Sequence, residues 1–200
     1  PRRVGKSSLL EELGRRLSRK YIAVNFDVTA VHPLNKVNFL KHLGRDILNA
    51  YVSSTSKRKL QVTLGMKLED FMNAIKRLRV DLGGWATVYI AENPDLTDLA
   101  GRTFELPEQL ASECGKDFLV MLDEVPKLIR LKGNTPYPED IDFVWTLRGH
   151  MHKKRRSHFI ITGSAVGMVE RLYRPGDSPF HGTFLTRQMG GIDRGSAEKL

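Results

Sequence analysis

The 200-residue sequence has a single cysteine, Cys114, and no long apolar run. One cysteine excludes an internal disulfide framework and is typical of a protein in a reducing cytoplasm. A transmembrane helix needs about 20 consecutive apolar residues, and no such run is present. A signal peptide is not visible either. We therefore expect a cytoplasmic protein with no membrane contact, in which residues 1–200 form one domain.

Acidic residues are the minority charge, because 32 lysines and arginines face 23 aspartates and glutamates and give a formal net charge of +9. Such a field attracts nucleotides, nucleic acids or acidic proteins. Four consecutive basic residues lie in HMHKKRRSH, residues 150–158. This stretch has no interleaved aromatic residues for base stacking. It is either a phosphate-contacting patch or a solvated loop, so DNA stays open as a partner.

Helical and strand patterns alternate along the chain. The strand patterns at 117–125 and 158–164 are almost unbroken apolar runs, which is typical of parallel strands buried on both faces. The sequence therefore predicts an α/β fold with a mainly parallel, doubly wound sheet. The expected helices lie around residues 9–17, 40–51, 68–78, 106–114 and 143–151; the other expected strands are 21–28 and, less clearly patterned, 87–91, and 132–140 is an expected loop.

The segment PRRVGKSSLLEEL, residues 1–13, joins a Gly-Lys-Ser triplet to the first helical pattern. It matches the second half of the phosphate-binding pattern G-x-x-x-x-G-K-[ST], whose first glycine would fall one residue before Pro1. In that pattern Lys6 reaches the β- and γ-phosphates and the Ser7 hydroxyl is a ligand of Mg²⁺. The candidate nucleotide-binding residues are Arg3, Val4, Gly5, Lys6, Ser7 and Ser8.

An acidic pair, Asp123 and Glu124, closes the apolar strand pattern FLVMLDE. An aspartate at this position of a nucleotide-binding sheet holds Mg²⁺, and the following glutamate can act as the general base toward water. The alternative is a strand that simply ends in a solvated acidic turn. Acids at the carboxyl end of a parallel strand lie where ligands bind in such sheets. Asp27, which ends the strand at 21–28, either approaches the same site or only terminates its strand.

Together with FIITGSAVGMVERL at 159–172, the segments at 1–13 and 118–128 resemble the AAA-type P-loop ATPases of the prokaryotic "archaeal ATPase" family, relatives of the STAND signalling ATPases and of replication-initiator ATPases. The resemblance implies ATP and Mg²⁺ as ligands and a sheet of the additional-strand type in the order 5-1-4-3-2. It also implies a polar sensor residue after the fourth strand. Ser164 matches that position and Thr162 is the alternative, although Ser164 could instead cap the next helix.

Two features depart from that family. Its Gly-Arg pair is replaced by Gly182-Thr183, so the role of that arginine does not transfer. Arg171, Arg174 and Arg187 are alternatives that the sequence does not separate, and Arg187 could belong to the last strand. The family's first strand would precede Pro1. Without it we expect exposed hydrogen-bonding groups on the neighbouring strands, lower stability and weak nucleotide affinity.

Three functions remain open from the sequence. The leading one is an ATPase in which Lys6, Glu124 and Ser164 act on the phosphates and water, while Ser7 and Asp123 hold Mg²⁺. The second is a slow nucleotide-gated switch that signals through a protein partner or a second copy of the chain. The third is a DNA-associated module. GTP is disfavoured, because no N-K-x-D guanine-reading motif is present.

Overall fold

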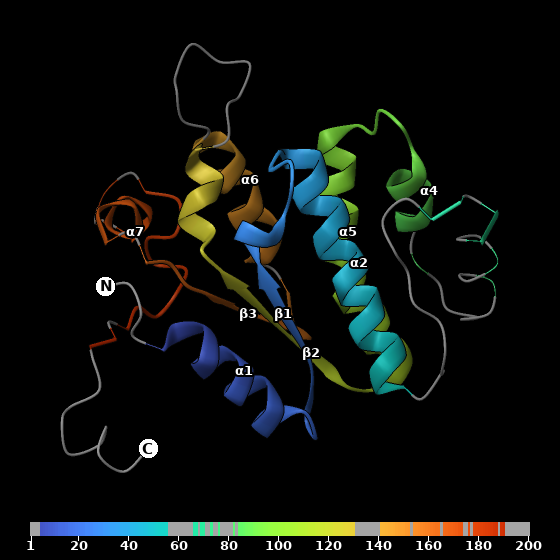
Figure 1. Cartoon of the computed structure of the whole chain (residues 1–200), viewed down its shortest axis with the longest axis horizontal. Coiled ribbons are helices and arrows are strands. Elements are labelled where there is room, and N and C mark those ends of the chain that lie inside the picture. Colours follow the sequence, from blue (N-terminus) through green and yellow to red (C-terminus); the bar gives the residue numbers. More distant parts are fainter. Residues whose placement is uncertain are drawn as a thin grey trace.

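The structure, a computed structural model, describes most of the chain and is shown in Figure 1. The described residues are 5–55, 66–67, 69–70, 73, 76, 82, 84–130, 141–152, 154–164, 166–173, 176, 178–187 and 189–190. Three parallel strands form one sheet in the order β1-β2-β3. The elements are α1 (Lys6–Leu17), β1 (Tyr21–Asp27), η1 (Val28–Ala30), α2 (Lys36–Ser54), α4 (Trp85–Ile90), α5 (Leu96–Cys114), β2 (Asp117–Asp123), η2 (Val125–Arg130), α6 (Ile141–Met151), β3 (Ser157–Ile161) and α7 (Val166–Tyr173).

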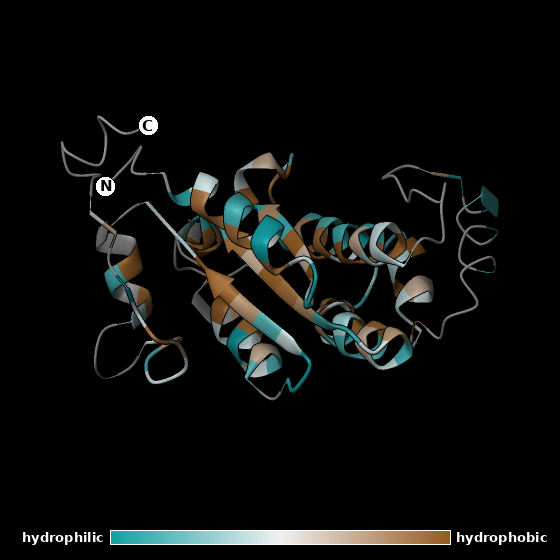
Figure 2. Cartoon of the chain, turned by 90° about the horizontal axis from the view of Figure 1, so that it is seen from below, coloured by the Kyte–Doolittle hydropathy of each residue, from teal (hydrophilic) through white to brown (hydrophobic). Residues whose placement is uncertain are grey.

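Helices cover both faces of the sheet, as the unbroken apolar strands predicted. On one face, Leu119 and Met121 of β2 pack in a cluster with Leu10 of α1. On the other face, Val120 and Leu122 belong to a larger core with residues of α2, α5 and α6. Figure 1 shows α1 on one side of the strands and α2 and α5 on the other, and apolar residues colour much of the strands in Figure 2. The α/β class with a parallel sheet is therefore confirmed.

The predicted strand at 87–91 is wrong, because this segment lies mainly in helix α4. Trp85 and Tyr89 are one helical turn apart, both are buried, and their ring centroids lie 4.7 Å from each other. A Cβ atom at Gly44 of α2 would lie 2.5 Å from the Trp85 ring. The contact with α2 therefore uses a helical spacing of apolar residues, which overrides the β propensity of Thr87 and its neighbours.

Other element boundaries differ from the prediction at their ends. The helix expected at 106–114 begins ten residues earlier, at Leu96, where Asp95 accepts a hydrogen bond from the Asp98 N–H group at 2.8 Å. It ends where expected, at Gly115, whose φ of 76° suits a glycine C-cap. The expected loop 132–140 and most of the expected helix 68–78 lie outside the described residues.

The carboxyl-terminal part of the described chain differs from the expected fifth strand. Residues 183–187 make turns and irregular chain, and Arg187 belongs to no strand. Among the described residues, β3 pairs with β2 on one edge and with no strand on its other edge. None of the described helices is long and apolar enough to cross a membrane.

Candidate active site

The amino end of α1 meets the carboxyl end of β2. Ser7, in the first turn of α1, donates a hydrogen bond of 2.5 Å from Oγ to Oδ2 of Asp123, the last residue of β2. Asp123 is nearly buried, with 8% of its surface exposed. The fold thus brings together two predicted site residues that are 116 positions apart in the chain.

Gly5 and Lys6 shape the start of α1. Gly5 is the N-cap residue with φ 78° and ψ 18°, a left-handed conformation that glycine adopts without a steric cost. It gives α1 no side-chain cap, and the N-terminus of a helix favours anions through its N–H groups and its dipole. Lys6, the first helical residue, lines a cavity beside β3. The start of α1 therefore combines a helix N-terminus without a side-chain cap and a lysine that borders a cavity.

Two further donors orient the Asp123 carboxylate. The Thr162 hydroxyl, just after β3, donates to Oδ1, and the N–H group of Glu124 donates to the same oxygen at 2.9 Å. With Ser7 on Oδ2, both carboxylate oxygens are held by the protein. A carboxylate with a fixed direction beside a serine hydroxyl is suited to share a cation with phosphate oxygens.

Glu124 has a left-handed backbone, with φ 59°. It is the single residue other than glycine with positive φ among those that the structure describes. Such a conformation is uncommon for a glutamate, and strained backbone clusters at functional sites. Its Oε2 accepts a hydrogen bond of 3.3 Å from the N–H group of Ser164. The backbone turn thus directs this carboxylate toward the chain that follows β3.

The two sensor candidates contact different acids. Ser164 contributes its backbone N–H group to Glu124, whereas Thr162 contributes its side-chain hydroxyl to Asp123. The hydroxyl contact therefore favours Thr162, which the sequence placed second. β3 ends at Ile161, so Thr162 is the first residue after the carboxyl end of this strand. Its hydroxyl can therefore reach Asp123, which ends the neighbouring strand.

Asp27 ends β1 opposite Asp123 in the sheet register, but it has a local role. Its carboxylate accepts hydrogen bonds from the N–H group and the hydroxyl of Thr29, each at 2.7 Å. It thus caps the 3₁₀ turn η1. This favours the strand-terminating interpretation over a place in the site.

A cavity of about 640 Å³ lies beside β3 and α7 and is also lined by residues 183–187 and Met189. Lys6 and Thr162 border it, as does the exposed Arg187. Apolar residues of β3 and α7 also line it. A large anionic ligand seated at α1 would have Lys6 and Arg187 beside it.

The remaining predicted residues are less defined. Arg3, Val4 and Arg174 lie outside the described residues, and of Arg171 only the place in α7 is described. Ser8 is exposed on α1. Gly163 was not among the predicted residues, although a Cβ atom there would lie 2.4 Å from the Pro126 ring. The sequence feature that could have pointed to Gly163 is its position between the two candidate sensor residues, Thr162 and Ser164.

A protein-only metal site is not present in the described part of the chain, which holds no group of three or more His, Cys, Asp or Glu residues placed for a metal. Mg²⁺ differs from many metals in this respect. It is commonly bound by one or two protein groups together with substrate phosphates and water. The pair formed by Ser7 and Asp123 fits such a shared site.

Comparison of the chain with protein-family models, curated proteins and solved structures found no match. The function is therefore inferred from the site itself.

Proposed function

We propose that this chain is a core domain that binds ATP with Mg²⁺ and hydrolyses it. The observation that carries the proposal is the hydrogen bond between Ser7 and Asp123. These two residues are the Mg²⁺ ligands of the two nucleotide-binding patterns, and each pattern alone has an ordinary structural explanation. Their direct contact at the carboxyl end of β2 supports a shared metal site.

Each residue has a chemical role in this proposal. Gly5 and the first turn of α1 would receive the phosphates, and Lys6 would contact their β- and γ-oxygens. Ser7 and Asp123 would hold Mg²⁺, which neutralises charge on the phosphates when bound. Glu124 would accept a proton from the attacking water.

The strand order supports an ATPase of the additional-strand type. In the expected order 5-1-4-3-2, the second, third and fourth strands are neighbours. The observed order β1-β2-β3 agrees if these strands are the family's second, third and fourth. In this arrangement the family's first strand would lie beside β3, at the edge that pairs with no strand of the described residues. The adjacent Asp-Glu pair and the missing guanine-reading motif favour ATP over GTP.

Isothermal titration with ATP tests the proposal. We expect ATP to bind more tightly with Mg²⁺ than with EDTA, and GTP to bind more weakly than ATP. Ser7→Ala should lose the gain due to Mg²⁺, because it removes one of two protein ligands. The control is Ser112→Ala, an exposed serine of α5. Equal ATP binding in Mg²⁺ and in EDTA, together with no effect of Ser7→Ala, would contradict the proposal.

Hydrolysis should depend more on Thr162 than on the Ser164 hydroxyl. Thr162→Val removes a hydroxyl that donates to Asp123, and we expect kcat/KM to fall by about 10- to 100-fold, as for the removal of a hydrogen bond to a charged partner. Ser164→Ala keeps the backbone N–H group that contacts Glu124, so its effect should be within about threefold. Steady-state phosphate release measures both. The reverse order would return the sensor role to the Ser164 hydroxyl.

A further inference from the structure

Basic residues gather at the amino-terminal edge of the sheet, the opposite end from Asp123. Lys20 directly precedes β1, Lys116 precedes β2, and Arg155 and Arg156 precede β3. β1 and β2 start opposite each other, and β3 starts opposite the second residue of β2. Neighbouring strands are about 4.8 Å apart, so these side chains start from one short row.

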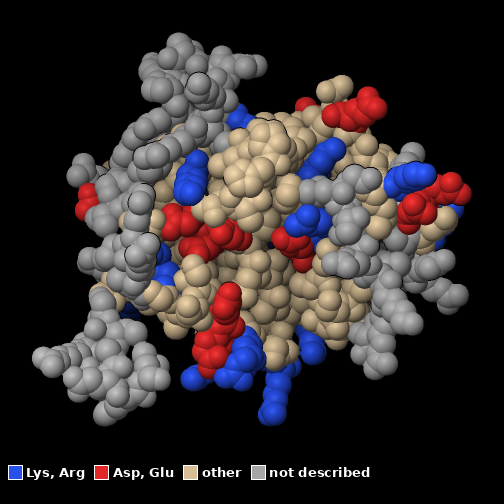
Figure 3. Space-filling view, viewed as in Figure 1, with Lys and Arg blue, Asp and Glu red and all other residues tan. Residues whose placement is uncertain are grey.

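The end of α1 extends this row. Arg15 and Arg16 lie in its last turn and Arg19 follows it, all three exposed. Lys and Arg side chains gather along the lower side of the molecule in Figure 3, where α1 ends in Figure 1. We call these residues the amino-edge cluster: Arg15, Arg16, Arg19, Lys20, Lys116, Arg155 and Arg156.

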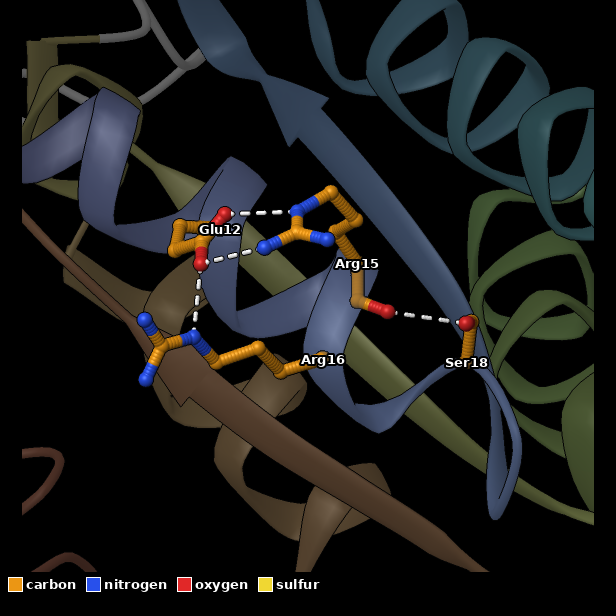
Figure 4. A network of polar contacts seen from close by, with 4 residues as sticks. All are labelled: Glu12, Arg15, Arg16 and Ser18. Atoms are coloured by element: carbon orange, nitrogen blue, oxygen red, sulfur yellow. Dashed lines mark hydrogen bonds and ion pairs between the residues drawn. The ribbon is translucent and has the colours of Figure 1, made fainter.

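Part of the cluster has acidic partners, but these do not cancel its charge. Figure 4 shows that Glu12 accepts hydrogen bonds from both Arg15 and Arg16. These bonds lower the pKa of Glu12 to about 2, and the bonds from Arg15 have a larger effect than the bond from Arg16. One carboxylate thus accepts hydrogen bonds from two guanidinium groups. The side chains of Arg15 and Arg16 are nevertheless 73% and 72% exposed. The network therefore orients positive charge and leaves it accessible.

The loop before β3 is only partly neutralised. Arg156 pairs with Asp117 at 2.9 Å, and Lys154, outside the cluster, pairs with Glu105. Arg155 is exposed and has no carboxylate partner among the described residues. Within the predicted patch at 150–158, Lys154 and Arg156 lie between α6 and β3 and are held in ion pairs, whereas the charge of Arg155 adds to that of the strand starts.

Two further members of the cluster, Arg19 and Lys116, also have no carboxylate partner among the described residues. Arg19 is exposed and Lys116 is half-buried. Arg19, Lys116 and Arg155 come from three separate segments at the same edge of the sheet. Their charges are therefore available to an anionic partner that spans this edge.

The chemistry of the cluster favours nucleic acid over an acidic protein. Protein interfaces are centred on buried apolar or aromatic residues. The exposed large apolar residues of the described chain are Leu9 and Leu185, and neither lies in the cluster. Five of its seven members are arginines, whose planar guanidinium groups match phosphate oxygens. We propose that the amino-edge cluster binds the phosphate backbone of DNA without reading its sequence, at a surface separate from the proposed ATP site.

Fluorescence anisotropy with a short labelled DNA duplex of mixed sequence tests this proposal. The wild-type chain should bind, and its affinity should fall steeply as salt rises from about 50 to 200 mM. The variant Arg19→Glu/Lys116→Glu/Arg155→Glu should bind at least about tenfold more weakly. Its salt slope should be shallower by about 1 for each phosphate that the variant no longer neutralises.

The control is Lys67→Glu/Lys76→Glu/Lys127→Glu, which changes the net charge equally at exposed lysines outside the cluster. It should bind DNA within about twofold of wild type, and circular dichroism should show all three proteins folded. Equal weakening in both variants would reduce the effect to overall charge and overturn the proposal. Salt-independent binding would also overturn it, as would binding of polyglutamate or anionic lipid vesicles in preference to DNA.

Discussion

Replacing Glu124 with glutamine is expected to lower kcat for ATP hydrolysis by about 10²- to 10⁴-fold while ATP still binds. An amide has nearly the shape of the carboxylate but cannot take a proton from water. Its oxygen can still accept the hydrogen bond from Ser164, so the loop after β3 should keep its place. Titration calorimetry measures ATP binding, and single-turnover phosphate release measures the chemical step.

Two variants separate catalysis from backbone strain. Glu11→Gln removes an exposed carboxylate of α1 and should leave the rate unchanged. Glu124→Gly should also abolish turnover, yet it should unfold at the same or a higher denaturant concentration, because glycine accepts a φ of 59° without strain. Undiminished hydrolysis in Glu124→Gln would remove Glu124 from the proposed role. Slow turnover in the wild type would favour the nucleotide-gated switch.

The meeting of Ser7 and Asp123 could be predicted because both lie at element ends. A residue that opens a helix and one that closes a parallel strand are placed by topology alone, since ligand sites form at the carboxyl ends of such strands. The contact between them needs no knowledge of loop conformation. This explains why the short motifs were informative although their surroundings were only partly predicted.

Features that depend on exact boundaries or on distant partners were not predictable. Thr162 rather than Ser164 directs a hydroxyl at Asp123 because β3 stops at Ile161, three residues before the end of the strand predicted at 158–164. The ion pair of Lys154 likewise comes from Glu105, 49 positions away. Local charge patterns contain no information about such partners, so the sequence could not show which cations of this loop are held in ion pairs.

Gly163→Ala should destabilise the domain by about 1–3 kcal/mol and impair hydrolysis. The backbone around Gly163 is fixed to η2, because the Val125 N–H group donates to the Thr162 carbonyl at 3.0 Å. An added Cβ would lie 2.4 Å from Pro126 Cγ and 3.0 Å from Val169 Cγ2. A proline ring cannot rotate away, so the chain after β3 must move. Thr162 would then shift relative to Asp123, and urea unfolding together with phosphate release would record both effects.

The same substitution at Gly149 is the matched control. Gly149 lies within α6, where an added Cβ atom would have no neighbour within 4 Å. Alanine is the better helix former by about 1 kcal/mol, so Gly149→Ala should stabilise the domain and leave hydrolysis unchanged. Glycine is therefore required at position 163 because a larger residue would clash with its neighbours, and not because the backbone has a positive φ. If Gly163→Ala were as stable and as active as wild type, the tight contact between η2 and the loop after β3 could not be what places Thr162 at the site.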